Sequence, residues 1–220
     1  FTFICVICMY VPLLYAGLNG VLAALITSIV ILAASIYILN GFSSKTICAI
    51  IGTSTGIIIS GGLAMIAGSM SHLNGFNMTD VESMIYIANN SKLHVSDILY
   101  AGILISSLGA VMDVSVSIVA AITEIHEKAP HLKAKELFMS GMHVGHDMMG
   151  TMSNTLILAY TGSATGTLLT IYSYEMPYLQ FMGYNSIIIE IVCGLCGTIG
   201  VILTVPIQAF ITTMVLKVRK

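Results

Sequence analysis

The feature that most constrains this chain is a series of six long apolar segments with shorter polar stretches between them. About 20 apolar residues in a helix cross the hydrocarbon core of a bilayer, which is about 30 Å thick. Only 8% of the 220 residues are charged and 57% are hydrophobic, so a water-soluble fold would lack the polar surface that it needs. The sequence therefore predicts an all-α polytopic membrane protein, a helical bundle of about six transmembrane helices, over residues 1–15, 20–40, 46–70, 96–123, 143–163 and 186–216.

The distribution of basic residues predicts how this bundle is oriented. Lysine and arginine in short loops are retained on the cytoplasmic side of a membrane. Most of the basic residues follow the second, fourth or sixth segment, namely Lys45, Lys128, Lys133, Lys135, Lys217, Arg219 and Lys220. Lys92 falls on the opposite side, in a connection over 71–95 whose capping-box pattern at Thr79–Glu82 predicts a short surface helix. We therefore expect both termini in the cytoplasm and a multi-pass protein of the cell membrane.

Composition and motifs argue against several classes of protein. The net charge of −2 comes without a basic cluster, so we expect no nucleic-acid partner. The chain has no nucleophile with a base at fixed spacing, no phosphate loop and no HExxH motif, so we expect neither an enzyme nor a cofactor. Residues 1–220 are expected to form a single transmembrane domain in the lipid bilayer, with a three-span part over 1–70 and a second part over 71–220.

One face of the fourth segment carries only small or polar residues. They are spaced by four or three positions, which places them on one helical stripe: Gly102, Ser106, Gly109, Asp113, Ser117, Ala120 and Glu124. The remaining face is mainly apolar and suits lipid, whereas a small and polar face suits close contact with another helix. The fifth segment repeats the pattern with His143, Asp147, Gly150, Asn154 and Thr161.

Two aspartates in these stripes are the leading candidates for function. Asp113 lies eleven residues before Glu124 and Asp147 lies eleven after Glu136, which places each about 16 Å from the loop that joins the two segments. A charged aspartate at the centre of a transmembrane helix costs about 2.5–3.5 kcal/mol, so such residues usually face a protein interior or a wet cavity. An antiparallel hairpin would bring the two carboxylates face to face, whereas a surface-lying start of the fifth segment would leave Asp147 shallower.

Two desolvated carboxylates close together can share a proton near neutral pH. We therefore predict a transport or proton-relay site formed by Asp113, Asp147 and Asn154, with His143 and His146 as partners on the cytoplasmic side. The alternative is structural, in which Asp113 and Asn154 form hydrogen bonds across helices and hold the bundle together.

The string HVGHD also permits a metal hypothesis. His143 and Asp147 are four residues apart and His146 lies beside them, so one helical turn would offer three ligands. Five nearby methionines would favour copper(I), yet methionine is also a common filler of apolar helices, so no metal is assigned. Glu190, early in the sixth segment, either faces an outer vestibule or extends to the membrane interface.

Three successive strings resemble the motifs of the YibE/F family of bacterial multi-pass membrane proteins: HVSDILYAGILISSLGAVMDVSVSIVAAITEIHE, SGMHVGHDMMGTMSNTLILAYTGS and GTIGVILTVPIQAFI. The resemblance covers about residues 70–216 and implies a position in the bacterial inner or plasma membrane. Asp113, Asp147 and Asn154 stand at positions that match the family's motifs, whereas His146 stands where an arginine is expected. The chain resembles the smaller, YibF-type member, which implies a larger YibE-like membrane protein as partner, with a homo-oligomer as the alternative.

These observations support two hypotheses of function. In the first, the chain is a transporter or channel subunit for an unknown small solute or ion, with Asp113 and Asp147 as the coupling pair. In the second, it is a non-transporting scaffold or subunit that assembles with a larger partner. An aspartate-to-asparagine change keeps the shape of the side chain and removes its titration, so it separates the two.

Overall fold

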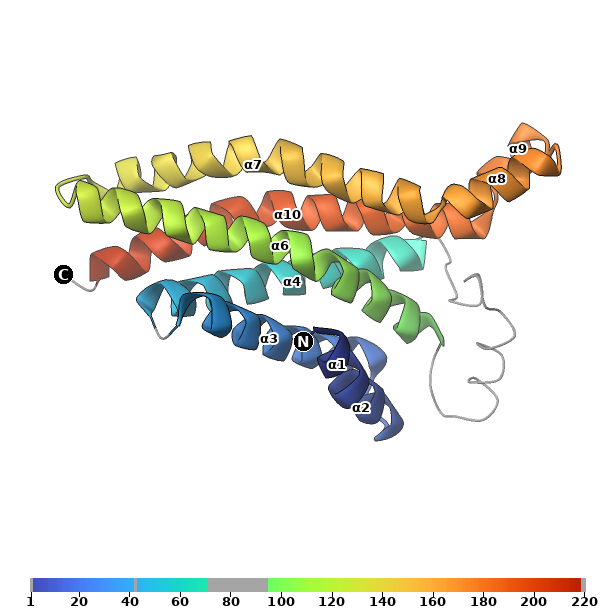
Figure 1. The fold of residues 1–220 in the computed structure, drawn as a ribbon, viewed down its shortest axis with the longest axis horizontal. Coiled ribbons are helices and arrows are strands. Elements are labelled where there is room, and N and C mark those ends of the chain that lie inside the picture. The colour runs from blue at the N-terminus through green and yellow to red at the C-terminus, as the bar shows by residue number, and fades with distance from the viewer. Residues whose placement is uncertain (1, 42, 71–94, 219–220) are drawn as a thin grey trace.

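The computed structural model describes residues 2–41, 43–70 and 95–218, and every regular element in these ranges is a helix (Figure 1). The elements are α1 (Thr2–Cys5), η1 (Val6–Tyr10, a π-helical turn), α2 (Val11–Tyr15), α3 (Gly20–Asn40), α4 (Ser44–Met70), α6 (Val95–Lys128), α7 (Ala134–Ser163), α8 (Thr165–Ser173), α9 (Tyr178–Met182) and α10 (Asn185–Val218). The prediction of an all-α fold is confirmed. The short helix that the capping box at Thr79–Glu82 was predicted to start lies outside the described residues.

Four of the described helices are long and apolar enough to cross a membrane, namely Gly20–Ile38, Lys45–Met70, Val95–Lys128 and Asn185–Lys217. Thr2–Tyr15 is a shorter apolar helix. Helix α7 has 30 residues, enough to cross, but its many polar residues keep it out of that group of four. Apolar helices of this length support the prediction of a membrane helical bundle, while the count of six spans and the cytoplasmic position of both termini stay predictions.

The long helices run side by side, with α7 at one edge of the bundle (Figure 1). Helices α3, α4, α6 and α10 pack together, and α7 lies against α10 and α6. Helices α8 and α9 project beyond the end of the bundle. The apolar interior that these helices share includes Ile31, Leu32, Ile36, Ile57, Leu104, Val111, Ile118, Ile122, Val201 and Val205.

Small residues allow α4 and α10 to approach each other closely. A Cβ added at Gly52 would overlap Gln208 Oε1, and a Cβ added at Gly56 would overlap Thr204 Oγ1. Gln208 is fully buried there, and its Nε2 donates to the backbone oxygen of Cys48 at 3.0 Å. Since a hydrogen bond across helices is favourable in an apolar surrounding, this amide ties α10 to α4.

The described lysines lie at one end of the bundle. Lys45 Nζ is 3.2 Å from Glu127 Oε1, which joins the start of α4 to the end of α6. Lys217 Nζ donates to the backbone oxygen of Leu132 at 2.6 Å, which joins the end of α10 to the α6–α7 loop. The start of α4, the α6–α7 loop and the end of α10 therefore lie at the same end of the bundle. Which side of the membrane this end faces stays a prediction.

Candidate functional site

The two candidate aspartates lie at the middle of adjacent helices. Asp113 comes 18 residues after Val95 and 15 before Lys128, near the centre of α6. Asp147 comes 13 residues after Ala134 and 16 before Ser163, near the centre of α7. Because α7 is one continuous helix through both His143 and Asp147, the alternative in which its first part leaves the helix and lies along the surface is not what the structure has.

The five predicted site residues all point away from the interior of the chain. Asp113, Asp147, Asn154, His143 and His146 are exposed, and within the described ranges none of them makes a hydrogen bond or an ion pair. The two carboxylates are therefore not buried together inside this chain, contrary to what we expected from the sequence. The physical reason is that α7 turns its other face inward, with the buried residues Leu137, Gly141, Gly145 and Leu156.

Glycines show which helix faces this chain uses for packing. A Cβ at Gly141 would overlap Ile122, and a Cβ at Gly145 would overlap Val205, so these two glycines let α7 lie close to α6 and α10. A Cβ added at any glycine of the predicted polar stripes would meet no atom within 4 Å: Gly102, Gly109 and Gly150. At these three glycines the stripes are therefore open surface on the single chain.

The metal hypothesis finds no assembled site. Across the residues that the structure describes, no three or more His, Cys, Asp and Glu side chains are grouped so that they could hold a metal ion. At about 100° per residue, His143 and Asp147 lie about 40° apart around α7, whereas the adjacent His146 is turned by about 100° from Asp147. His143, His146 and Asp147 are thus three outward side chains of one helix.

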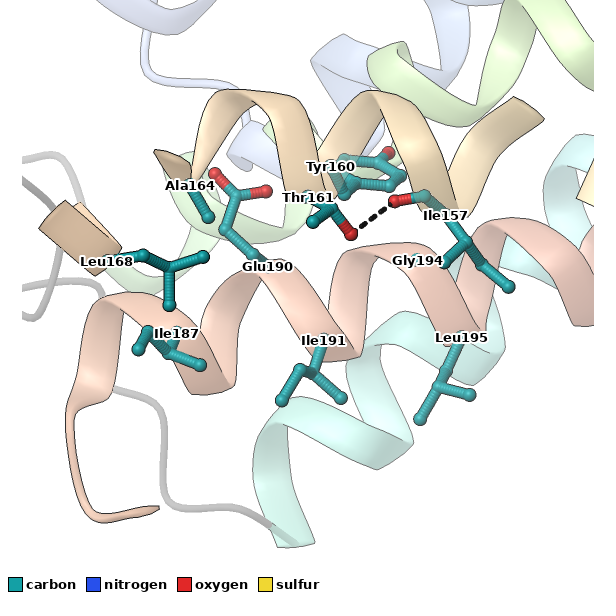
Figure 2. Close-up of a pocket in the computed structure, with 10 residues that line it drawn as sticks. All are labelled: Ile157, Tyr160, Thr161, Ala164, Leu168, Ile187, Glu190, Ile191, Gly194 and Leu195. Atoms are coloured by element: carbon teal, nitrogen blue, oxygen red, sulfur yellow. Dashed lines mark hydrogen bonds between the residues drawn. The ribbon is translucent and has the colours of Figure 1, made fainter. Parts of the chain in front are cut away.

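A groove with an acidic residue lies where α7 and α8 meet the start of α10 (Figure 2). Its cavity of about 280 Å³ has an almost wholly apolar wall that includes Ile187, Ile191 and Leu195. Figure 2 shows Glu190 rising from α10 towards α7, with its carboxylate between Ala164 and Thr161. Glu190 is half-buried and has no hydrogen-bond or ion-pair partner among the described residues.

A second cavity of about 550 Å³ adjoins the first and shares Ala164, Ile187 and Glu190 with it. Its wall is more polar and includes the hydroxyl-bearing residues Ser163, Thr167, Thr170, Tyr184 and Ser186. Glu190 therefore stands at the junction of an apolar and a polar hollow. Whether this hollow is an outer vestibule or lies at the membrane interface stays a prediction.

One hydrogen bond joins this groove to the polar stripe of α6. The hydroxyl of Tyr160, a residue of the groove wall, donates to Ser106 Oγ at 2.7 Å. Ser106 is a member of the stripe that contains Asp113, seven residues and about 10.5 Å further along the helix. The sequence analysis named Ser106 and Glu190 but missed Tyr160. The groove depends on the angle between α7 and α8, and the residue pattern does not predict that angle.

The comparison with protein families agrees with the resemblance in the sequence. The family described as YibE/F-like protein matches residues 1–218. The match begins at residue 1 and so includes the first 70 residues, which the three quoted motifs do not reach. Neither the comparison with curated proteins nor that with solved structures finds a match. The chain belongs to the YibE/F-like family.

Proposed function

We propose that this protein is one subunit of a membrane transporter or channel for a small solute or ion, and that Asp113 and Asp147 lie where it meets a second transmembrane chain. The observation that carries the proposal is the outward position of both carboxylates at the centres of α6 and α7. Each would cost about 2.5–3.5 kcal/mol if it faced lipid at the bilayer centre. A cost of this size for two groups is a large part of the 5–15 kcal/mol that typically stabilises a folded protein.

A partner or a water-filled path would remove that cost. The open glycines support a partner, because small residues on a transmembrane helix let a second helix approach. Polar side chains on both sides of such a contact leave room for water, and carboxylates at mid-depth can then carry a proton or bind a cation. In this arrangement Asp113 and Asp147 are the coupling groups, Asn154 is a hydrogen-bonding neighbour, and His143 and His146 lie nearer the lysine end.

The second candidate function is a non-transporting subunit that assembles with a larger YibE-like membrane protein. The same exposed stripes support it, since they offer a surface for another chain whether or not water enters. A homo-oligomer would use the same surface. Transport and scaffold differ in what the carboxylates do: a transporter needs them to titrate, and a scaffold needs only their shape and hydrogen bonds.

The experiment compares Asp113→Asn and Asp147→Asn with the unchanged protein in vesicles from cells that make the native assembly. Proton movement is driven by an imposed membrane potential and followed with a pH-sensitive dye trapped inside. We expect both variants to assemble normally and to lose the proton movement that the unchanged protein supports. Ser117→Ala, on the same stripe of α6, is the control and should move protons normally. If both aspartate variants assembled and moved protons like the control, the coupling role would be refuted.

A further inference from the structure

The groove beside Glu190 has two parts of different chemistry that meet at one charged group. The 280 Å³ part runs along the apolar side chains of α10 towards Leu195, and the 550 Å³ part is lined by hydroxyl groups from α8 and the start of α10. Most small-molecule sites combine an apolar cavity with a few polar groups that fix the orientation of the ligand. The Glu190 groove has that composition, with the carboxylate as its one charged member.

The carboxylate of Glu190 lacks a counter-charge in the described part of the chain. No ion pair involves Glu190 there, and the residues that line the two hollows with it carry no positive charge. A charged group beside an apolar wall is costly unless a partner compensates it. An occupant with a positive charge would supply that partner.

The depth of Glu190 indicates how a ligand would lie. Helix α10 has 34 residues, about 51 Å, which exceeds the hydrocarbon thickness of about 30 Å, so a centred helix would extend about 10 Å beyond the hydrocarbon layer at each end. Glu190 is five residues after Asn185, about 7.5 Å along the helix. The carboxylate therefore lies near the edge of the hydrocarbon layer, with the polar hollow on its outer side and the apolar hollow on its inner side.

We propose that this groove binds organic cations that carry an ammonium group on an apolar body. The ammonium pairs with Glu190, and the apolar body lies in the hollow lined by Leu168, Ile191 and Leu195. The ring of Tyr160, on the same wall, adds an aromatic surface for a cation. A bare metal cation fits less well, because calcium takes six to eight oxygen ligands and gains nothing from an apolar wall.

This inference names a substrate class for the proposed transport function and rests on that function for its role in the cell. Binding is measured without transport, so the two can fail separately. Asp113→Asn and Asp147→Asn lie outside the groove and should bind the cation like the unchanged protein. If the two aspartate variants bound the cation and also moved protons like the Ser117→Ala control, the proposed function alone would be overturned. If they lost proton movement while the unchanged protein did not bind the cation, this inference alone would be overturned.

The test uses isothermal titration of the delipidated full chain in an uncharged detergent, with benzyltriethylammonium as the probe. We expect saturable binding, and we expect Glu190→Gln to weaken it about tenfold or more, because the attraction between the carboxylate and the positive charge of the probe is lost. Glu175→Gln is the matched control, since Glu175 is an exposed acid at the same end that does not line either hollow of this groove. Benzenesulfonate, an anion of similar shape, should not bind.

A second variant covers the case in which Glu190→Gln fails to fold. A Cβ on Gly194 would meet only Tyr160 Cδ2, at an ordinary 3.5 Å, so Gly194→Val narrows the apolar hollow and keeps the charge. It should also weaken binding of the probe.

A lipid headgroup could supply the same ammonium group as a free organic cation. Mass spectrometry of the protein before delipidation distinguishes the two sources. A phosphatidylethanolamine that is retained by the unchanged protein and lost from Glu190→Gln would identify a lipid ammonium as the occupant. Equal affinity of the unchanged protein and both variants, or equal binding of benzenesulfonate, would overturn the proposal.

Discussion

The contact between Gly52 on α4 and Gln208 on α10 gives a sharp test of how this bundle is held together. In Gly52→Ala the new methyl group would occupy the position of Gln208 Oε1, so the amide must move. Moving it puts at risk the bonds from Gln208 Nε2 to the Cys48 backbone oxygen at 3.0 Å and to Thr212 Oγ1 at 3.2 Å. A methyl group on the same helix at Gly62 would meet nothing within 4 Å. The two substitutions are therefore chemically identical and differ only in their surroundings.

The magnitudes can be worked out from these contacts. Overpacking a core costs about 1–3 kcal/mol, and each lost hydrogen bond adds about 0.5–1.5 kcal/mol. The helix gains about 0.5–1 kcal/mol when alanine replaces glycine. With both bonds lost, these ranges combine to about 1–5 kcal/mol, so we expect Gly52→Ala to lower the free energy of unfolding by about 3 kcal/mol, the middle of that range. Gly62→Ala should leave it unchanged or raise it by up to about 1 kcal/mol.

The assay is unfolding by sodium dodecyl sulfate in mixed micelles, followed by the helical signal in circular dichroism. The decisive comparison is a double-mutant cycle with Gln208→Ala, which removes the amide that the methyl group meets. Gly52→Ala should then cost almost nothing, so the two changes should couple by about 3 kcal/mol. The reasoning is refuted if Gly52→Ala is as stable as Gly62→Ala, or if its cost is the same with and without the amide.

Three other changes test the packing of α7 and the contacts at its ends. Gly145→Leu should destabilise the chain by at least about 2 kcal/mol in the same assay, because its side chain would overlap Val205. Gly150→Leu should leave the stability unchanged and reduce the assembled fraction in native gel electrophoresis. Tyr160→Phe should lower the free energy of unfolding by about 1 kcal/mol through loss of the bond to Ser106, and an unchanged value would show that the bond contributes nothing. Lys45→Met should cost less than about 1 kcal/mol, since the two side chains of its ion pair are 39% and 63% exposed, and a larger loss would contradict that estimate.

The sequence predicted where the helices lie better than where they end. The segment predicted over 20–40 is α3, and the segment predicted over 186–216 lies within α10. Helix α7 begins nine residues before residue 143, the predicted start of the fifth segment. Its first turns are polar, so a prediction based on apolar residues does not include them. The backbone N–H of Lys133 donates to Glu136 Oε2 at 2.8 Å, which stabilises that early start. Charged residues can continue a helix beyond the hydrocarbon layer, so apolar length marks the span and not the whole helix.

The spacing of residues in the sequence could not predict which way each helix face points. Spacing of three and four identifies a stripe, but it does not say whether the stripe faces the chain's own core or another molecule. Helix α7 has two such stripes, one with Gly141 and Gly145 and one with Asp147 and Gly150. The buried apolar residues beside the first pair, Leu137 and Leu156, are the signal that could have identified the inner face.

The position of α7 bears on both candidate functions. It lies at the edge of the bundle against α6 and α10, and its polar face is turned away from both. Helices that are apolar all round tolerate lipid on the open side, but α7 would place Asp147 in hydrocarbon at a cost of about 2.5–3.5 kcal/mol. That cost falls only if another protein surface or water covers the face, and in our proposal a second chain covers it. Whether water reaches Asp147 inside that unit is then the single property that separates a transporter from a scaffold.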